Sequence, residues 1–254
     1  MSGPADRITV LNTPCAVTGV ADFIATVQGL ARREEGATCV DFTNVHIVAQ
    51  RRVDAEFRRI TDTMDWFVPD SQVLVWAVRL LGGKMSSRAY GPVFLCECIR
   101  ATPAPFTHYF LGGSADCVEK LQRAMKAVQP GLQIAGAHHG YFDVSEESRI
   151  VEEINRLRPD FIWVGLGTPR QQDWMHRHRG AIRRGVILAV GFAFDVNAGT
   201  KPDAPAWVGR IGLTWLYRML REPRRLFWRY AKYNTIFLWF LLGQWLRRVF
   251  RRGK

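Results

Sequence analysis

The sequence of 254 residues has no long apolar segment near its start and no low-complexity tract. Its first residues, MSGPADRITVLN, lack the apolar core of an export signal, so we expect no signal peptide. Cysteine is sparse, with five residues at positions 15, 39, 96, 98 and 117, and no two of them form a Cys-x-x-Cys pair. This spacing disfavours a zinc or dithiol motif and is typical of a reducing, cytoplasmic compartment.

Several nucleotide and metal motifs are also missing. No G-x-G-x-x-G follows a first strand and no G-x-x-x-x-G-K-[ST] occurs, which argues against a dinucleotide enzyme and a P-loop enzyme. No Asp-x-Asp occurs, so the usual carboxylate clamp for a nucleotide-sugar-bound divalent ion is lacking. The neighbours His138 and His139 diverge, and His176 and His178 do not share a helix face. We therefore predict no metal and no cofactor.

Acidic residues are nearly absent from the end of the chain. Residues 206–254 hold ten Arg and two Lys against Glu222 alone, which is +11 of the total net charge of +12. A nearly neutral body, residues 1–205, is thus followed by a basic appendage, residues 206–254. Such an appendage favours an acidic partner: membrane phosphates, a phosphate-bearing ligand or nucleic acid.

Short apolar runs alternate with helical patterns along the body. We expect strands at residues 7–11, 38–42, 66–68, 108–111, 132–137, 161–164 and 185–191, and helices at 17–31, 45–60, 71–81, 115–128 and 146–157. This alternation is typical of an α/β fold, a Rossmann-like parallel sheet flanked by helices. Ligands of such sheets bind beyond the carboxyl ends of the strands. That rule gathers the following residues on one rim: Thr43, Asn44, Asp70, Gly112, Gly113, Tyr141, Gly167, Gln171 and Asp195.

The stretch RPDFIWVGLGTPRQQDW, residues 158–174, carries the strongest local signal. A buried strand at 161–164 ends in Gly165-Leu166-Gly167, and a helix follows, with Thr168 as its expected N-cap and Pro169 at its first position. A strand, a glycine turn and a helix N-terminus offer unpaired N–H groups to an anion. The turn chemistry alone does not separate a phosphate site from a tight turn without a ligand.

The appendage has two parts. Arg218, Arg221, Arg225 and Arg229 have helical spacing, but Pro223 allows either one helix or two. Between Lys232 and Arg247 lie 14 uncharged residues, about 21 Å as a helix, which is too short to span a bilayer core of roughly 30 Å. The aromatic content favours a helix in the membrane interface through residues 231–254. The alternative is a dimerisation helix or one that docks on the core.

Each polar residue at a strand end has two possible roles, one structural and one functional. Asp70 directly follows an apolar run and precedes a helix, so it either caps that helix or acts as a general base. Thr43 and Asn44 either bind a sugar or cap a helix. Arg88, in a turn after a glycine pair, either binds phosphate or is solvated.

The chain resembles the WecG/TagA/CpsF glycosyltransferase family over nearly its whole length. The matching runs are Thr43-Asn44, VPDS at 68–71, WAVRLLGGK at 76–84, RAYGP at 88–92, FLGG at 110–113, HHGYF at 138–142, the stretch 158–174, VGFAFDVNAG at 190–199 and LTWLYRMLREPRRLFWRY at 213–230. The resemblance implies a Rossmann-like enzyme on the cytoplasmic face of the bacterial inner membrane. Its reaction would be an inverting, metal-independent transfer of a sugar from UDP to a polyprenyl-diphosphate-linked glycan in cell-surface or exopolysaccharide synthesis.

The resemblance also implies site residues. It makes Asp70 the general base, with Thr43, Asn44 and Gln171 beside it. The expected ligand-binding positions are Arg88, Gly112, Gly113, Tyr141, Phe142, Gly165, Gly167, Arg218, Arg225 and Arg229. The expected partners are a UDP-sugar, the lipid-linked acceptor and the membrane surface, and no nucleic acid, because the apolar run at 236–242 suits lipid better than bases.

Five positions depart from the family pattern: Ser71, Gln172, Val93, Asp203 and Thr214. They leave the donor open among N-acetylmannosamine, its uronic acid and glucose. They also leave one alternative function, a catalytically degenerate, nucleotide-binding membrane scaffold.

Overall fold

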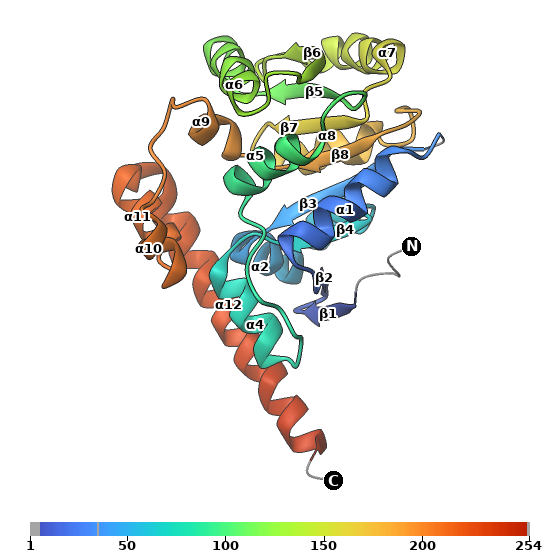
Figure 1. The fold of residues 1–254 in the computed structure, drawn as a ribbon. Coiled ribbons are helices and arrows are strands. Elements are labelled where there is room, and N and C mark those ends of the chain that lie inside the picture. Colours follow the sequence, from blue (N-terminus) through green and yellow to red (C-terminus); the bar gives the residue numbers. More distant parts are fainter. Residues whose placement is uncertain (1–5, 35, 253–254) are drawn as a thin grey trace.

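The computed structural model describes residues 6–34 and 36–252, and within them eight strands form one sheet (Figure 1). The strands are β1 (Arg7–Val10), β2 (Thr13–Ala16), β3 (Thr38–Thr43), β4 (Trp66–Pro69), β5 (Thr107–Gly112), β6 (Gln133–His138), β7 (Phe161–Gly165) and β8 (Val186–Ala189). Their order is β1-β2-β4-β3-β8-β7-β5-β6, and only β1 and β2 pair antiparallel. The predicted Rossmann-like α/β fold is confirmed, and every predicted strand is present; β2 was missed.

Helices cover both faces of the sheet. One face carries α1 (Val20–Ala31), α5 (Gly91–Ala101), α6 (Ala115–Val128) and α9 (Ala193–Asn197); the other carries α2 (Val45–Val53), α3 (Ala55–Thr61), α7 (Glu147–Leu157, after the short turn η1, Val144–Glu146) and α8 (Arg170–His178). Apolar strand residues point alternately into the two layers, so that Trp163 packs under α5 and Val164 under α8. Burial on both faces explains why the parallel strands read as continuous apolar runs.

The helix expected over 45–60 is interrupted, so that prediction is wrong at its centre. Asp54 is extended, with φ −119° and ψ 104°, and ends α2. Its carboxylate accepts a hydrogen bond from the N–H of Phe57 and caps α3. Because the Asp54 carboxylate bonds to a backbone N–H, it favours a helix start over continuation of α2, and a second helix begins in a new direction.

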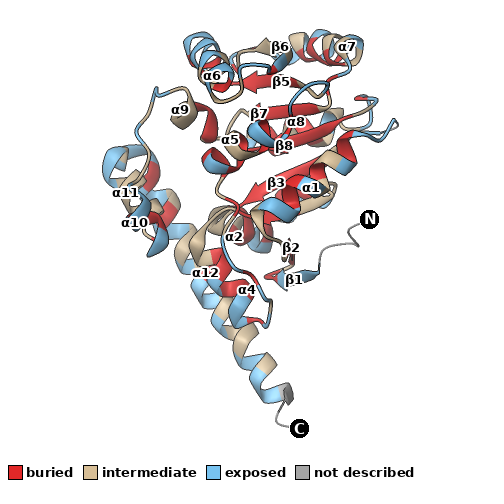
Figure 2. Ribbon diagram, in the orientation of Figure 1, coloured by how far each residue is buried: buried red, intermediate tan, exposed pale blue. Residues whose placement is uncertain are grey.

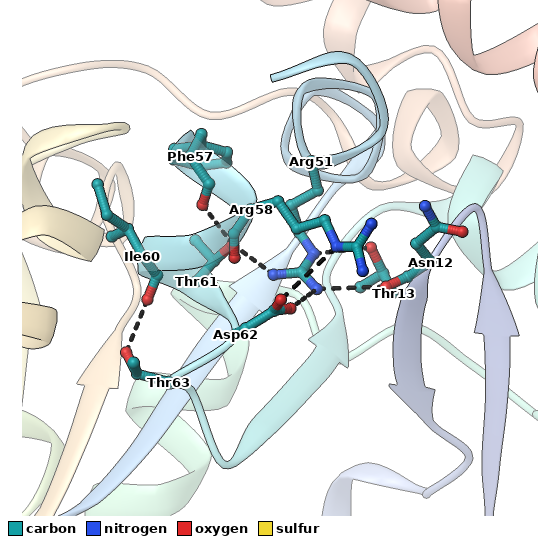
Figure 3. Close-up of polar contacts among 9 residues, drawn as sticks. All are labelled: Asn12, Thr13, Arg51, Phe57, Arg58, Ile60, Thr61, Asp62 and Thr63. Atoms are coloured by element: carbon teal, nitrogen blue, oxygen red, sulfur yellow. Dashed lines mark hydrogen bonds and ion pairs between the residues drawn. The ribbon is translucent and has the colours of Figure 1, made fainter. Parts of the chain in front are cut away.

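Arg51 of α2 joins the sheet edge to α3 (Figure 3). It is 1% exposed; its Nε donates to the hydroxyl of Thr13 at 3.0 Å and its guanidinium pairs with Asp62 at 2.7 Å. It also donates to the hydroxyl of Thr61 and to the carbonyl of Asn12. A buried charge with this many partners fixes β2 against the α2–α3 pair.

The appendage contains α10 (Ala206–Arg210), α11 (Thr214–Arg221) and α12 (Pro223–Arg252). The two-helix alternative at Pro223 is therefore the correct one, although the second helix has 30 residues. In Figure 1, α12 passes α2 and α4 (Gln72–Leu80) and projects beyond the sheet. None of the helices in the described part of the chain is long and apolar enough to cross a membrane.

The middle of α12 is part of the core. Phe237 is fully buried in a cluster with Val48 of α2 and Leu74 of α4. Further along, Gln244 accepts from the N–H of Leu11 at 3.0 Å and donates to the carbonyl of Thr9 at 2.8 Å. The core-docking alternative thus holds for one face of α12, whereas the opposite face is exposed (Figure 2).

Candidate active site

A cavity of about 730 Å³ lies at the carboxyl ends of the strands, where the rim was predicted. The sheet and its loops form the floor, and α11 and α12 form a second wall. Of the predicted site residues, those lining it are Asn44, Asp70, Arg88, Gly113, Tyr141, Gly165, Gly167, Gln171, Arg218, Arg225 and Arg229. The sheet and the appendage thus meet over one space.

Asp70 lies on the cavity floor directly after β4. The capping role belongs to Ser71, whose hydroxyl accepts from the N–H of Leu74. Oδ1 of Asp70 instead accepts a 2.7 Å hydrogen bond from the N–H of Gly91, at the start of α5. Burial raises the pKa of Asp70 to about 6, against the opposing effects of that hydrogen bond and of Arg88 and Arg218. The carboxylate is ionised at neutral pH and basic enough to accept a proton.

Asn44 and Thr43 serve the local structure. The Asn44 side chain caps α2 by accepting from the N–H groups of His46 and Ile47. Thr43 is fully buried and does not line the cavity. Its hydroxyl donates to Asp41, a buried carboxylate whose pKa burial raises. The structure gives Thr43 a supporting place behind the site; its predicted catalytic role stays a prediction.

The helix entry after β7 differs from its prediction. Thr168 is not the N-cap: α8 begins at Arg170, and Pro169 is the preceding residue. The N–H of Gln171 is bonded to the carbonyl of Gly167, and those of Gln172 and Asp173 to that of Pro169. The turn therefore offers an anion fewer free N–H groups than its sequence indicates.

Gln171 faces the cavity with a fixed amide. Its Oε1 accepts from the N–H of Gly167 at 3.2 Å, so its NH₂ group is the end that remains for a ligand. Gly167 itself has φ +78°, a conformation that favours glycine.

The remaining predicted positions divide into packing and rim residues. Gly112 does not line the cavity; a Cβ there would lie 2.5 Å from the backbone of Gly165, so the glycine permits β5 and β7 to approach. Tyr141 is 77% exposed at the rim, whereas Phe142 is buried. Arg170 holds their loop by donating to the carbonyls of Gly140 and Phe142 at 2.6 and 2.8 Å. Tyr141 is thus an exposed ring on an anchored loop.

Besides Arg170, four arginines line the cavity, and they differ in how far nearby carboxylates compensate their charge. Arg88 donates to the hydroxyl of Thr214 and lies 4.1 Å from the Tyr90 ring centroid. Arg218 lies 3.9 Å from that of Phe192. Neither has a carboxylate in its salt-bridge range among the described residues. Guanidinium groups held on aromatic rings keep their N–H donors for an anion.

Arg225 and Arg229 differ from Arg88 and Arg218 in their polar partners. Arg225 pairs with Glu222, which also binds Lys201 at 3.2 Å. Burial, together with the charges of Arg218 and Arg225, lowers the pKa of Arg229, and its Nε has no hydrogen-bond partner within the described residues. A half-buried guanidinium with an unused donor favours an anionic ligand.

Sequence reasoning missed several residues that line the cavity, among them His46, Lys201 and Tyr230. His46 packs against Tyr233 of α12, with ring centroids 4.4 Å apart, and burial lowers its pKa to about 3. It therefore stays neutral and joins α2 to the appendage. Its position two residues after the predicted strand-end residue Asn44 was the available signal.

The arrangement is suited to group transfer between two ligands. A carboxylate with a raised pKa faces a space whose other wall carries guanidinium groups, so one side accepts a proton while the other binds a diphosphate. In the described part of the chain, no group of three or more His, Cys, Asp or Glu residues is placed to hold a metal ion.

The sequence pattern of the glycosyl transferase WecG/TagA/CpsF family matches residues 8–251. The chain belongs to this glycosyltransferase family. It is similar to an N-acetylglucosaminyldiphosphoundecaprenol N-acetyl-beta-D-mannosaminyltransferase of Bacillus subtilis strain 168, with 25% identity over 229 residues, 90% of this chain and 87% of the relative. A protein of the same description from Staphylococcus aureus strain MW2 is 29% identical over 184 residues, 72% of each chain.

Proposed function

We propose that the protein transfers a sugar from a UDP-sugar to a polyprenyl-diphosphate-linked acceptor with inversion at the anomeric carbon. The observation that carries this proposal is the position of Asp70, on the floor of a cavity whose facing wall bears the arginines. The relatives' names support the acceptor, because they describe transfer to N-acetylglucosaminyldiphosphoundecaprenol. They also favour N-acetylmannosamine over its uronic acid and glucose as the donor sugar.

The proposed reaction is a single displacement. Asp70 takes the proton of the acceptor hydroxyl as its oxygen bonds to the anomeric carbon, and the bond from that carbon to the UDP oxygen breaks. Negative charge then grows on the diphosphate, where Arg88 and Arg218 stabilise it. The exposed ring of Tyr141, at the rim, stacks on the uracil ring of the donor in this proposal. Every step uses groups of the chain, and we propose no metal or cofactor.

We further propose that α11 and α12 lie on the cytoplasmic face of the membrane. The exposed apolar face comprises Leu220, Phe227, Trp228, Leu238, Trp239, Leu242, Leu246, Val249 and Phe250. Arginines flank these residues, as in helices that lie in the interface of an anionic bilayer. Leu238 also lines the cavity, so the apolar face and the site adjoin. A lipid diphosphate can thus reach Asp70 with its chain in the bilayer.

The decisive experiment measures UDP release from a panel of UDP-sugars, with and without a polyprenyl-diphosphate-linked N-acetylglucosamine. We expect one donor to give acceptor-dependent release and a β-linked product. UDP binding without turnover of any donor would instead support the nucleotide-binding scaffold. Absence of UDP binding would refute both functions.

A further inference from the structure

A hydrogen-bonded chain connects a buried carboxylate to the hydroxyl of a threonine that lines the cavity. Asp41 of β3 and Gln172 of α8 are both fully buried. Nε2 of Gln172 donates to Oδ2 of Asp41 at 2.7 Å, and also contacts Oγ1 of Thr168 at 3.4 Å. Thr168 lines the cavity. The chain of hydrogen bonds therefore runs from strand β3 to the lining of the cavity.

The hydrogen bonds of this chain run in one direction. Oδ1 of Asp41 accepts from Thr43 and its Oδ2 accepts from Nε2 of Gln172, so the NH₂ end of the Gln172 amide faces Asp41. The second amide hydrogen is then directed to Thr168. Its hydroxyl accepts that hydrogen, which leaves its own proton for another acceptor. Within the described residues, no hydrogen bond donated by the Thr168 hydroxyl to the protein is present.

We propose that Thr168 donates a hydrogen bond to a phosphate oxygen of the nucleotide diphosphate, and that Gln172 and Asp41 are positioning residues for it. This inference rests on the proposed UDP-sugar function. A hydroxyl that accepts one hydrogen bond is a better donor of its own. Its role replaces the helix N–H groups that the sequence led us to expect, since Gln171 and Gln172 use theirs within the turn.

Charge favours a phosphate oxygen as the acceptor. Arg88 and Arg218 enter the same cavity without a carboxylate partner in the described residues, so they attract an anion to it. A fixed hydroxyl at the end of the β7 turn adds direction to this attraction. Hydroxyl groups that donate to charged oxygens form shorter and stronger bonds than neutral pairs.

The test is calorimetric binding of UDP and of the turned-over UDP-sugar to the full-length protein. Thr168→Val removes the hydroxyl and keeps the shape, Thr168→Ser keeps the hydroxyl, and Thr26→Val, on the exposed side of α1, is the matched control. We expect Thr168→Val to weaken UDP binding at least about 10-fold, because a bond to a charged group is lost. Thr168→Ser and Thr26→Val should stay within about threefold of wild type.

The positioning role has its own readout. Gln172→Met removes the amide, and the loss of UDP affinity in Gln172→Met/Thr168→Val should not exceed that of Thr168→Val alone, since both act through one hydroxyl. Additive losses would show that Gln172 acts only on the fold and would overturn its role. If Gln172→Met fails to fold, the Thr168 pair still decides the contact.

The remaining outcomes separate this inference from the proposed function. Equal losses in the Val and Ser variants, or no loss in either, would overturn the Thr168 contact. A loss for the UDP-sugar but not for UDP would place the contact on the sugar and overturn the phosphate assignment. Failure of wild type to bind UDP would instead overturn the proposed function, and the inference with it.

Discussion

Oδ1 of Asp70 accepts a 2.7 Å hydrogen bond from the backbone N–H of Gly91. One oxygen of the carboxylate is thereby fixed at the start of α5, and the other remains for a ligand. Asp70→Asn preserves the accepting oxygen but removes the base. We expect kcat to fall about 10²- to 10⁴-fold, the usual contribution of a general base. UDP affinity should stay near the wild-type value.

The matched comparison for this prediction is Asp195→Asn, which changes another carboxylate that lines the cavity. Steady-state turnover with the lipid-linked acceptor measures both variants. We expect a clearly smaller loss in Asp195→Asn. Near-normal turnover of Asp70→Asn would exclude Asp70 as the base.

The raised pKa of Asp70 also predicts a stability difference. The folded protein holds this proton up to a pKa of about 6, whereas the unfolded chain releases it near the ordinary pKa of 3.8. The favourable contribution of the protonated group is therefore complete below the unfolded pKa and is lost as the pH rises through about 6. Asp70→Asn should stabilise the free protein above this range by at most about 3 kcal/mol, at roughly 1.4 kcal/mol per pKa unit.

Chemical denaturation at several pH values checks that gain. The two proteins should differ least below about pH 4, where wild-type Asp70 is protonated in both states. A stability difference that is independent of pH would show that the raised pKa of Asp70 is not its cause.

The contacts of Arg88 with the Tyr90 ring and of Arg218 with the Phe192 ring predict that a positive charge alone is insufficient for UDP binding. Lys substituted at either position loses the planar fork and its stacking on Tyr90 or Phe192. We expect about 10-fold weaker UDP binding for Arg88→Lys, from the loss of a charge-assisted bond. Arg100→Lys, at an exposed site on α5, is the control. Equal affinities in calorimetry would assign Arg88 to the link with Thr214 only.

The two faces of α12 predict separable effects. Trp239 is 74% exposed, so Trp239→Glu should reduce co-sedimentation with anionic liposomes and leave the thermal midpoint nearly unchanged. Phe237 is fully buried, so Phe237→Ala should cost about 3–5 kcal/mol of unfolding free energy. Deletion of residues 231–254 removes both faces and cannot distinguish them. Undiminished liposome binding by Trp239→Glu/Leu242→Glu would contradict the membrane contact.

The sequence revealed the strands and the rim because both follow from short-range patterns. Apolar runs mark strands buried on two faces, and their carboxyl ends meet at one edge. Asp70 and Gln171 were found by this rule. Asp41 was not, because a carboxylate inside an apolar run gives no sign of the glutamine from another helix that satisfies it.

Competition between partners explains one error, the N-cap expected at Thr168, and two contacts that the sequence did not show, those of Thr43 and Phe237. Thr168 is a residue type that often caps helices, but its hydroxyl contacts Gln172 and helix α8 starts two residues later. Thr43 lies at a strand end like Asp70, yet it turns to the buried carboxylate two residues before it, on the same face of the strand. Likewise, the sequence of α12 indicates an interfacial helix, because nothing in it shows that Phe237 packs against α2 and α4.

The bond between Gln244 and the Thr9–Leu11 turn has a consequence for synthesis of the chain. The first strand emerges from the ribosome early, but Gln244, which fastens it, is made 233 residues after Leu11. Tyr230 and Leu238, which complete the cavity wall, also arrive late. Since this pairing must await α12, a nascent chain that lacks this helix has no complete site. Donor nucleotide therefore meets the full cavity wall only after α12 has been made and has docked on the body.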